Sequence, residues 1–325
     1  MNKKSILIMT MDFPPAKGGL QTYSKELAIN LVNQGFQVII LTQAHEKAEV
    51  CDVNEIVVVR CPGPLRLPLL GFVLSMIVYA FRALRVASQY RPTIIHAIHW
   101  FPCGVIALLI RKFLGIKYVV SAHGLEIYST LLYSKGFFKK LLKMVLEGAS
   151  TVIAVSRFVC ELILKATQKV NIEIIPPFFS HAEFSKRNPN PEKVVIRHKL
   201  QGKIVLLTVG RLIERKGHDM VIRALPMILK RYPNVVYLIV GNGPNRGELE
   251  KLAQDLGVID MVVFAGEVDN QDLPDYYSAC DVFIMPCREI KEKGDVEGFG
   301  IVFLEAMFFG KPVIACLLYT SDAAD

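Results

Sequence analysis

The stretch that decides the fold is KIVLLTVGRLIERKGHDM, residues 203–220, where an apolar run ends at a glycine and a basic loop follows. The run is short and rich in Val, Leu and Ile, which is typical of a buried strand. The loop leads into a segment that we expect to become helical near His218. The stretch therefore predicts a strand, a loop and a helix in succession, the unit from which parallel sheets are built.

The same alternation extends in both directions along the chain. Between the apolar runs lie stretches with helical spacing of apolar residues, such as residues 20–35. The expected strands begin at residues 5, 37, 56, 93, 118 and 151 in the first half and at 203, 235, 261, 281 and 312 in the second. The sequence therefore predicts an α/β fold with two Rossmann-like, doubly wound parallel-sheet domains facing a cleft.

A proline-rich stretch separates the two halves. Residues 176–202 contain four prolines and charges of both signs, and they interrupt the alternation. Such composition is typical of a domain boundary. The 325 residues also exceed the roughly 100–200 that one domain usually has. We therefore predict an N-terminal domain at 1–178, a linker region at 179–202 and a C-terminal domain at 203–325.

Composition and charge narrow the class of protein. With 52% hydrophobic and 21% charged residues, the chain is expected to fold into globular domains. The net charge of +8 favours an anionic partner, either a phosphorylated small molecule, an anionic membrane surface or nucleic acid. Nucleic acid is not expected, because no aromatic–basic motif is present. The seven cysteines are scattered without a CxxC pair, which predicts neither a zinc site nor a disulfide framework and fits a reducing cytoplasm.

Membrane contact is expected at most at a surface. The longest run without charged residues or histidine, residues 67–81, has 15 residues, fewer than the roughly 18 of a spanning helix. Residues 128–150 combine aromatic and aliphatic side chains with several lysines. Such a segment could rest on an anionic membrane, or it could be an ordinary amphipathic helix packed on a sheet. We therefore predict a cytoplasmic protein, with peripheral attachment at the inner face of the membrane as an option.

Two cations follow the strand in the opening stretch. Arg211 and Lys216 lie in the loop that leads into the helix. A guanidinium and an ammonium beside the free N–H groups of a helix N-terminus suit a diphosphate. A solvated basic loop is the alternative reading of the same residues. No D-x-D pair suited to magnesium is present, and the two cations make a metal unnecessary for leaving-group charge, so no metal is expected.

A second motif, EGFGIVFLE, lies near the C-terminus. Its glycines predict a loop at Glu297 and a helix after it, so that the N–H groups of Phe299, Gly300 and Ile301 form a seat for an anion. Glu305 falls in that helix, and its carboxylate could accept two hydroxyl protons from a ribose diol. The alternative is that Glu297 is a loop charge and Glu305 a salt-bridged helix residue.

The first half offers weaker candidates. Gly18 and Gly19 follow the first strand, where backbone N–H groups could approach a ligand, although a plain tight turn fits equally well. His123 follows another strand at the end where ligands bind in such sheets, although a loop histidine is often structural. A third motif, VGNGPNR from Val240, resembles a dinucleotide fingerprint, but Arg246 replaces its third glycine, so we do not expect a nicotinamide site.

Taken in order, the motifs resemble those of the family-4 retaining glycosyltransferases of GT-B architecture. The motifs that carry the resemblance are PPAKGG, HGLE, AVSRF, VGRLIERKG, VGNGP, VFAGEV, YYSACDVFIMPC and EGFGIVFLEAMFFGKPVIA. The resemblance implies an acceptor-side first domain and a second domain that binds a nucleotide sugar. It also implies that Arg211 and Lys216 bind the donor diphosphate, Glu297 the donor sugar and Glu305 the ribose. His123 would then approach the transferred sugar, and Gly18 and Gly19 would lie near phosphate or acceptor.

The implied reaction is metal-independent transfer of a hexose, with retention, from a GDP- or UDP-sugar to a glycan or lipid acceptor. The nucleotide sugar is a co-substrate, and no cofactor is expected. The stretch PCREIKEKGDVEGFG is similar to that of bacterial mannosyltransferases acting on phosphatidylinositol mannosides, which favours mannose and GDP. Alternatives are a nucleotide-sugar epimerase of the same architecture and a truncated, non-catalytic nucleotide-sugar-binding protein. The second arises because CLLYTSDAAD, the last ten residues, matches nothing in the family pattern.

Overall fold

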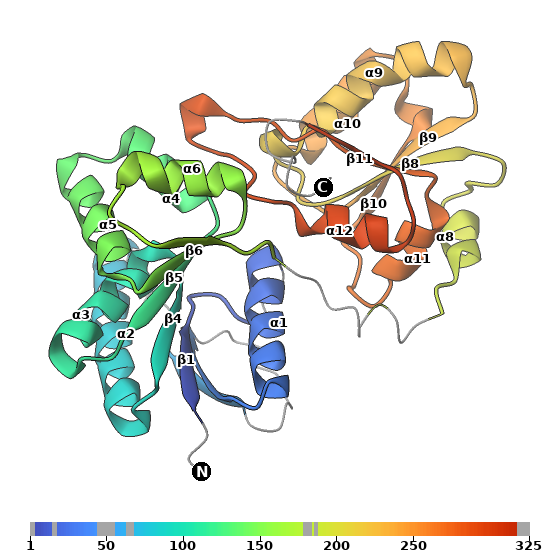
Figure 1. Ribbon diagram of the computed structural model, residues 1–325. Coiled ribbons are helices and arrows are strands. Elements are labelled where there is room, and N and C mark those ends of the chain that lie inside the picture. Colours follow the sequence, from blue (N-terminus) through green and yellow to red (C-terminus); the bar gives the residue numbers. More distant parts are fainter. Residues whose placement is uncertain are drawn as a thin grey trace. The chain divides into compact units, whose positions relative to one another are not determined.

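The computed structural model describes residues 4–14, 18–43, 56–62, 68–177, 184 and 188–316. Contacts divide the chain into two units, Met1–Phe178 and Phe179–Asp325 (Figure 1). Each unit contains its own parallel sheet, seven-stranded in the first and five-stranded in the second. This confirms the predicted α/β class with two parallel sheets. The domain limits drawn from the sequence stay a prediction.

The first unit is a parallel sheet covered by helices. Its strand order is β3-β2-β1-β4-β5-β6-β7, and every pairing is parallel. Figure 1 shows α1 on one side of the sheet and α2, α3 and α5 on the other. The elements are β1 (Ser5–Met9), α1 (Gly19–Asn33), β2 (Gln37–Gln43), β3 (Ile56–Cys61), α2 (Pro68–Tyr90), β4 (Ile94–Ile98), α3 (Val105–Leu114), β5 (Tyr118–Ala122), α4 (Leu125–Tyr133), α5 (Gly136–Gly148), β6 (Thr151–Ala154), α6 (Arg157–Ala166) and β7 (Ile172–Ile174).

The apolar patterns of the sequence predict six of these seven strands, and the exposure of the seventh explains why no pattern marks it. β1 is buried along its whole length because helices cover both faces of a parallel sheet. All six strands expected in this half form, each within one or two residues of its expected position. The seventh, β7, was not expected. It lies at the sheet edge and is largely exposed, so it lacks the apolar run that marks an inner strand.

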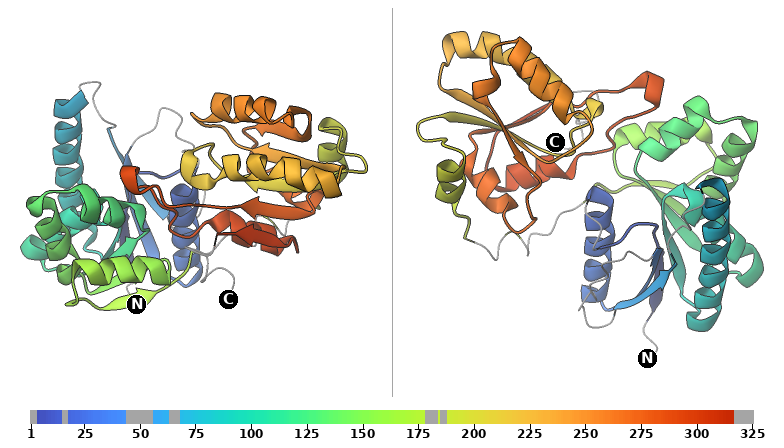
Figure 2. Two further views of the ribbon diagram at one scale, coloured as in Figure 1. Left: turned by 90° about the horizontal axis from the view of Figure 1, so that it is seen from above. Right: turned by 180° about the vertical axis from the view of Figure 1, so that it is seen from behind.

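The second unit repeats the design with the order β10-β9-β8-β11-β12, again parallel throughout. Its helices lie on both faces of the sheet, with α9 and α10 close together in the views from above and behind (Figure 2). The elements are α8 (Pro191–Arg197), β8 (Ile204–Val209), α9 (His218–Arg231), β9 (Val235–Val240), α10 (Arg246–Asp255), β10 (Val262–Gly266), α11 (Leu273–Ala279), β11 (Val282–Met285), α12 (Ile301–Phe308) and β12 (Val313–Ala315).

Part of the expected linker belongs to the core of this second unit. Residues 191–197 form α8, which packs against α11. Val194 and Leu200 are buried in the same cluster as Tyr276. The helix was missed in the sequence because it is short and begins at Pro191, a residue tolerated in the first turn of a helix but read there as a break.

Helix α2 is longer than the uncharged run suggested. Within the described residues, its segment Gly71–Tyr90 is long and apolar enough to cross a membrane by length and composition alone, and 33% of its most apolar window is buried. The run of 15 uncharged residues ends at Phe81, whereas the helix continues past Arg82 and Arg85. A single helix of this kind is weak support for a membrane span, because the core helix of a soluble protein can pass the same test.

Candidate active site

The strand order of the second unit places two loops at one point. β9 lies on one side of β8 and β11 on the other, so the chain reverses direction across the sheet between β8 and β11. In parallel sheets, ligands bind outside the carboxyl ends of strands at such a switch point. The loop after β8 carries Arg211 and Lys216, and the loop after β11 carries Glu297. The topology therefore brings the two motifs singled out in the sequence together.

An ion-pair cluster joins these two loops. Lys216 Nζ lies 2.7 Å from Glu297 Oε2, and Arg215 Nε lies 3.2 Å from the same oxygen. Arg215 Nη1 also reaches Asp295 Oδ1 at 2.8 Å. The exposed fractions of the Lys216 and Glu297 side chains are 11% and 13%, so this pair is largely shielded from solvent. We name Arg215, Lys216, Asp295 and Glu297 the switch-point cluster.

The cluster keeps Glu297 ionised. Burial acts to raise the pKa of Glu297, but the charges and hydrogen bonds of Lys216 and Arg215 outweigh it and hold that pKa below its usual value. Burial likewise acts to lower the pKa of Arg215, and the carboxylates of Glu297 and Asp295 raise it instead. Two cations and two carboxylates balance in charge, which is how charged groups are tolerated in a poorly solvated site.

Arg211 stands apart from the cluster. Its side chain is exposed and has no hydrogen bond or ion pair among the residues that the structure describes. Its backbone is nevertheless fixed, because His218 Nε2 donates to the Arg211 carbonyl at 3.3 Å. Burial lowers the pKa of His218 to about 4, so the ring is neutral, and its Nδ1 accepts from the Tyr237 hydroxyl at 3.2 Å. Arg211 thus presents its charge to solvent from an ordered loop.

Glycines make the close packing of these loops possible. At Gly217, φ is +73°, and a Cβ there would lie 2.1 Å from the carbonyl oxygen of Pro286. At Gly241, in the VGNGP motif, a Cβ would lie 2.1 Å from the carbonyl oxygen of Gly210. The motif that resembles a dinucleotide fingerprint therefore serves here as a close backbone contact that supports the loop after β8.

The second motif forms the start of α12 as expected. Gly300 caps the helix with φ +87°, and Ile301 is its first residue. A Cβ at Gly300 would lie 2.7 Å from the Phe303 ring. Phe299 is 5% exposed and anchors the loop before the helix. The helix has eight residues and begins directly after the loop that carries Glu297, so its free N–H groups follow that loop.

Glu305 has a partner that the sequence did not reveal. The Tyr277 hydroxyl donates to Glu305 Oε2 at 2.5 Å. Burial raises the pKa of Glu305, and the hydrogen bond from Tyr277 acts in the opposite direction. Burial also raises the pKa of Tyr277 well above its usual value, and the Glu305 charge adds to that effect, so the phenol stays protonated and donates. One carboxylate oxygen is thus occupied by protein.

Replacing Glu305 with glutamine is expected to stabilise the ligand-free protein at neutral pH. A carboxyl group with a raised pKa in the folded state disfavours folding once pH rises through that value. We expect Glu305→Gln to raise Tm by roughly 2–4 °C at pH 7.5 and to change it little at pH 4, where the carboxyl group is mostly protonated in both states. Differential scanning calorimetry at both pH values measures this. An equal change at both would contradict the prediction.

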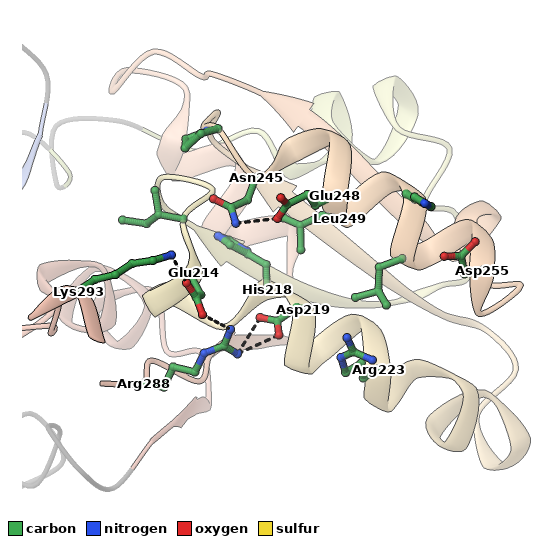
Figure 3. Close-up of a pocket in the computed structure, with 14 residues that line it drawn as sticks. Glu214, His218, Asp219, Arg223, Asn245, Glu248, Leu249, Asp255, Arg288 and Lys293 are labelled. Atoms are coloured by element: carbon green, nitrogen blue, oxygen red, sulfur yellow. Dashed lines mark hydrogen bonds and ion pairs between the residues drawn. The ribbon is translucent and has the colours of Figure 1, made fainter. Parts of the chain in front are cut away.

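The charged segment between β11 and Glu297, residues 287–296, contacts the loop after β8 and the start of α9. We name this segment the charged insertion. The Arg288 guanidinium contacts both carboxylate oxygens of Asp219 at 2.9 Å, and Lys293 Nζ lies 2.6 Å from Glu214 Oε2. These pairs border a polar groove of about 660 Å³ between α9 and α10, with Asn245 and its neighbour Glu248 on the opposite wall (Figure 3). Its carboxylates and cations are balanced, and the labelled ion pairs lie along its edge.

The first unit brings together three histidines. His123 lies after β5, with its ring centroid 5.2 Å from His99 and 4.9 Å from Tyr23. Its Nε2 is buried without a hydrogen-bond partner among the described residues. Burial lowers the pKa of His123 well below its usual value, with smaller contributions from His99 and His96, so the ring is neutral at pH 7. The backbone N–H of His123 donates to Glu126 Oε1 at 2.8 Å.

Gly18 and Gly19 begin α1. Gly18 is the residue before the helix, with φ +152°, and Gly19 is its first residue. A Cβ on Gly18 would lie 2.5 Å from Gln21 Oε1, the end of a flexible side chain. Both glycines are exposed. The neighbouring residues 15–17 and the C-terminal residues 317–325, on which the expectation of a truncated end rests, lie outside the described residues.

Sequence reasoning missed three residues of the candidate site: Arg215, Asp295 and Tyr277. Arg215 was visible beside Lys216, and Asp295 two residues before Glu297, but nothing local shows that they pair across 80 residues. Tyr277 lies on α11 and reaches α12 only through packing of the helices. Within the described residues, no group of three or more His, Cys, Asp or Glu side chains could hold a metal ion.

Family models match both halves of the chain. Residues 17–183 match the model described as Glycosyltransferase Family 4. Residues 190–319 match the model described as Glycosyl transferases group 1. The two matched segments contain each candidate residue, from Gly18 to Glu305.

Relatives agree with these family matches, and a solved structure shares the fold. A GDP-mannose-dependent alpha-(1-6)-phosphatidylinositol monomannoside mannosyltransferase from Mycolicibacterium smegmatis is 32% identical, over 95% of this chain and 80% of that protein. An alpha-monoglucosyldiacylglycerol synthase from Streptococcus pneumoniae is 27% identical, over 95% and 70%. The structure of sucrose-phosphate synthase from Thermosynechococcus elongatus superposes with a TM-score of 0.78, at 23% identity, over 98% and 82% of the two chains.

Proposed function

Because the chain belongs to glycosyltransferase family 4 and is a hexosyltransferase that uses a nucleotide-sugar donor, we propose that it transfers mannose from GDP-mannose to a lipid-linked acceptor. The observation that carries the proposal is the switch-point cluster, with the exposed Arg211 in the same loop as Lys216 and the start of α12 after the loop of Glu297. An exposed guanidinium, a shielded ammonium and a helix N-terminus together suit a diphosphate. The donor is a co-substrate, and the proposed reaction uses no metal.

In the proposed mechanism, the diphosphate is stabilised as it leaves. Arg211 and Lys216 bind its oxygens, and the N–H groups of Phe299, Gly300 and Ile301 add their dipoles. The acceptor hydroxyl attacks from the face on which the bond breaks, through an oxocarbenium-like state, and its proton passes to the departing phosphate. The configuration at the sugar is thereby retained, as in the family.

Two carboxylates hold the two ends of the donor in this proposal. Glu297 stays ionised and accepts hydrogen bonds from hydroxyls of the transferred hexose. Glu305 accepts from the ribose hydroxyls with the oxygen that Tyr277 leaves free. The pKa shifts of the two groups differ in direction, because cations contact Glu297 whereas burial dominates at Glu305.

His123 is proposed to contact the transferred sugar. Because its ring is neutral and its Nε2 has no protein partner among the described residues, it can exchange a hydrogen bond with a sugar hydroxyl without carrying charge. Gly18 and Gly19 offer exposed backbone at the start of α1 and are proposed to lie near phosphate or acceptor.

The donor is identified by a binding panel. We expect GDP-mannose to bind more tightly than UDP-glucose or ADP-glucose, and with equal affinity in magnesium and in EDTA, as measured by calorimetry. The GDP-mannose-dependent relative supports GDP-mannose, while the glucosyl relative makes a glucose donor the competing possibility, which UDP-glucose and ADP-glucose represent in the panel. A requirement for magnesium, or a preference for UDP-glucose, would overturn this part of the proposal. Conversion of the donor to its epimer without release of nucleotide would replace it with an epimerase.

A membrane surface is proposed as the source of the lipid acceptor. On α2, the buried residues are the small Gly71, Ser75, Ala83 and Ala87 together with Tyr79 and Val86, whereas most of its other large apolar residues face outward. The exposed ones are Phe72, Val73, Leu74, Ile77, Val78 and Phe81. An ordinary amphipathic helix packed on a sheet would carry polar residues on this outward face. Contiguous exposed apolar surface of this kind favours contact with another apolar phase.

Charge favours an anionic bilayer as that phase. Arg82 and Arg85 are exposed at the end of the apolar stripe of α2. Helix α3 packs beside α2, and α5 beside α3, so the exposed lysines of α5 and its Phe137 belong to the same layer of helices. The rest of α5 packs as an ordinary amphipathic helix, with Leu142 and Val145 buried. We therefore propose peripheral attachment at the cytoplasmic face of a membrane.

Vesicle sedimentation tests this attachment. We expect the variant with Phe72, Ile77 and Phe81 all replaced by Ser to bind vesicles of phosphatidylglycerol and phosphatidylcholine at least tenfold more weakly than the parent. The reason is the loss of about 25 cal/mol for each Å² of apolar surface transferred. The matched control replaces the exposed Met220 and Met227 of α9, which should leave binding unchanged. Equal binding by all three proteins would exclude α2 as the contact.

A further inference from the structure

We propose that Arg215 is a positioning residue: it stays paired with Glu297 when the donor diphosphate engages Lys216, and so allows a carboxylate and a diphosphate to lie side by side. The inference rests on the proposed function, since it assumes that Lys216 meets a diphosphate. Arg215 lies next to Lys216 in the sequence and had no role in the motif-based assignment.

Arg215 and Lys216 share one oxygen of Glu297. Lys216 Nζ at 2.7 Å and Arg215 Nε at 3.2 Å both contact Glu297 Oε2. If Lys216 served the diphosphate alone, Glu297 would be left beside added negative charge in a poorly solvated site. Because Arg215 contacts the same oxygen, Glu297 keeps a cationic partner while the ammonium of Lys216 turns its other N–H groups to phosphate.

The planar guanidinium of Arg215 can bind two carboxylates at once. Arg215 uses Nε for Glu297 and Nη1 for Asp295 at 2.8 Å, so one planar group links two carboxylates. An ammonium on a lysine stem is a single point of charge and lacks this fork. The exposed fraction of the Arg215 side chain is 21%. Arg215 therefore has the geometry of a fixed bridge between the two carboxylates.

The charged insertion holds Arg215 in place. The N–H of Arg288 donates to the carbonyl of Arg215 at 2.8 Å. The backbones of Ile290 and Asp295 form a short antiparallel bridge, with hydrogen bonds of 2.8 and 3.2 Å, that fixes where the Asp295 carboxylate lies. The charged insertion thus fixes the backbone of Arg215 and also positions the Asp295 carboxylate that Arg215 binds. A positioning role needs such support, because an unsupported side chain would turn toward the phosphate.

Other titratable groups that face Glu297 do not replace Arg215. These groups are Lys216, which the donor engages, and Cys287, which lies beside the cluster. Asp295 bears the same charge as Glu297 and contacts Arg215 instead. Burial raises the pKa of Cys287 to about 12, although the charge of Lys216 opposes this, so the thiol is neutral. Among the described groups, Arg215 is therefore the cation that remains for Glu297.

The test is a double-mutant cycle on binding of GDP and UDP, measured by calorimetry at pH 7.5. Arg215→Ala is expected to weaken binding about tenfold in the parent. In the Glu297→Gln background, the same change should weaken it less than twofold, because no carboxylate then needs a counter-ion. An equal loss in both backgrounds would overturn the proposal, since it would mean that Arg215 contacts the phosphates directly.

A readout without ligand separates this inference from the proposed function. Glu297 has a lowered pKa, so its contribution to stability is present above its ordinary pKa and is lost as pH falls. Without Arg215 that contribution shrinks, and the Tm difference between parent and Arg215→Ala should be largest near pH 7.5 and smallest near pH 4. If neither nucleotide binds the parent, the proposed function fails while this readout still decides the role of Arg215. A Tm difference independent of pH would overturn it.

Two further variants complete the design. Arg215→Lys keeps the charge but not the fork, so we expect it to restore less than half of the lost affinity. Lys293→Ala removes another cation that contacts the same loop, at Glu214, with a side chain 65% exposed, and should change GDP affinity less than twofold. In turnover assays, Arg215→Ala should move the acid limb of the kcat profile to higher pH. Full rescue by lysine, or an unmoved acid limb, would contradict a positioning role.

Discussion

Replacing Lys216 with alanine is expected to lower kcat/KM for hexose transfer by about 10²–10³-fold, the usual effect of removing one preorganised group that stabilises developing charge. Lys216 is 9% exposed, so its charge acts on the leaving diphosphate with little screening by water. Its ammonium lies 2.7 Å from Glu297, which places it between the group proposed to hold the sugar and the phosphates. The loss should therefore fall on kcat as well as on KM.

Steady-state kinetics with saturating acceptor measures this effect, and Lys293→Ala is the matched control. Lys293 carries the same charge within the same group of loops, but it is 65% exposed and pairs with Glu214 instead of Glu297. We expect the control to stay within twofold of the parent. If Lys216→Ala lost less than fivefold, or if the two lysine variants lost activity equally, Lys216 would not be the residue that stabilises the leaving group.

Replacing Gly217 with alanine is expected to destabilise the second unit by about 3 kcal/mol or more, which corresponds to a fall in Tm of roughly 10 °C. The left-handed conformation at φ +73° alone costs alanine about 1–2 kcal/mol. The remainder comes from the new Cβ, which would lie 2.1 Å from the carbonyl oxygen of Pro286. Because a backbone atom and not a flexible side chain is in the way, one of the two loops must move.

Two other glycines separate these contributions. Gly257 has φ +66°, but a Cβ there would have nothing within 4 Å, so Gly257→Ala should show only the conformational cost of about 1 kcal/mol. Gly247 lies in α10 with open space around it, and Gly247→Ala should be neutral or stabilising by up to about 1 kcal/mol. Thermal unfolding of the three variants, followed by circular dichroism, orders them. Equal destabilisation at Gly217 and Gly257 would show that the contact with Pro286 does not matter.

The loop around Gly217 also illustrates why the candidate site was visible in the sequence. Arg211 and Lys216 follow a strand, and Glu297 follows another, and in a parallel sheet both positions fall at the same edge. The residues that could not be predicted are those whose role depends on a partner far along the chain. Arg215 and Glu297 are 82 residues apart, and Tyr277 and Glu305 are 28 apart. No local periodicity encodes such pairs.

Helix α2 of the first unit likewise has features that the sequence predicts and one that only packing decides. Its length and apolar composition follow from the sequence, although the count of uncharged residues underestimated it. Which of its faces would be buried did not follow, because apolar residues lie on both faces and the one that packs carries Tyr79 and Val86 beside small residues. Only the packed structure reveals that the apolar stripe of Phe72, Ile77 and Phe81 stays exposed.

By itself, the sequence determined the two parallel α/β sheets, the order of the strands along the chain, the loops that carry Arg211, Lys216 and Glu297, and the helix that carries Glu305. These features depend on local patterns of apolar residues, glycines and charges, which act over a few residues. The tertiary structure alone decided that Arg215 and Lys216 share one oxygen of Glu297 and that Tyr277 occupies Glu305. Those contacts depend on how parallel strands and their helices pack, because packing sets the distances between side chains that the chain itself keeps far apart.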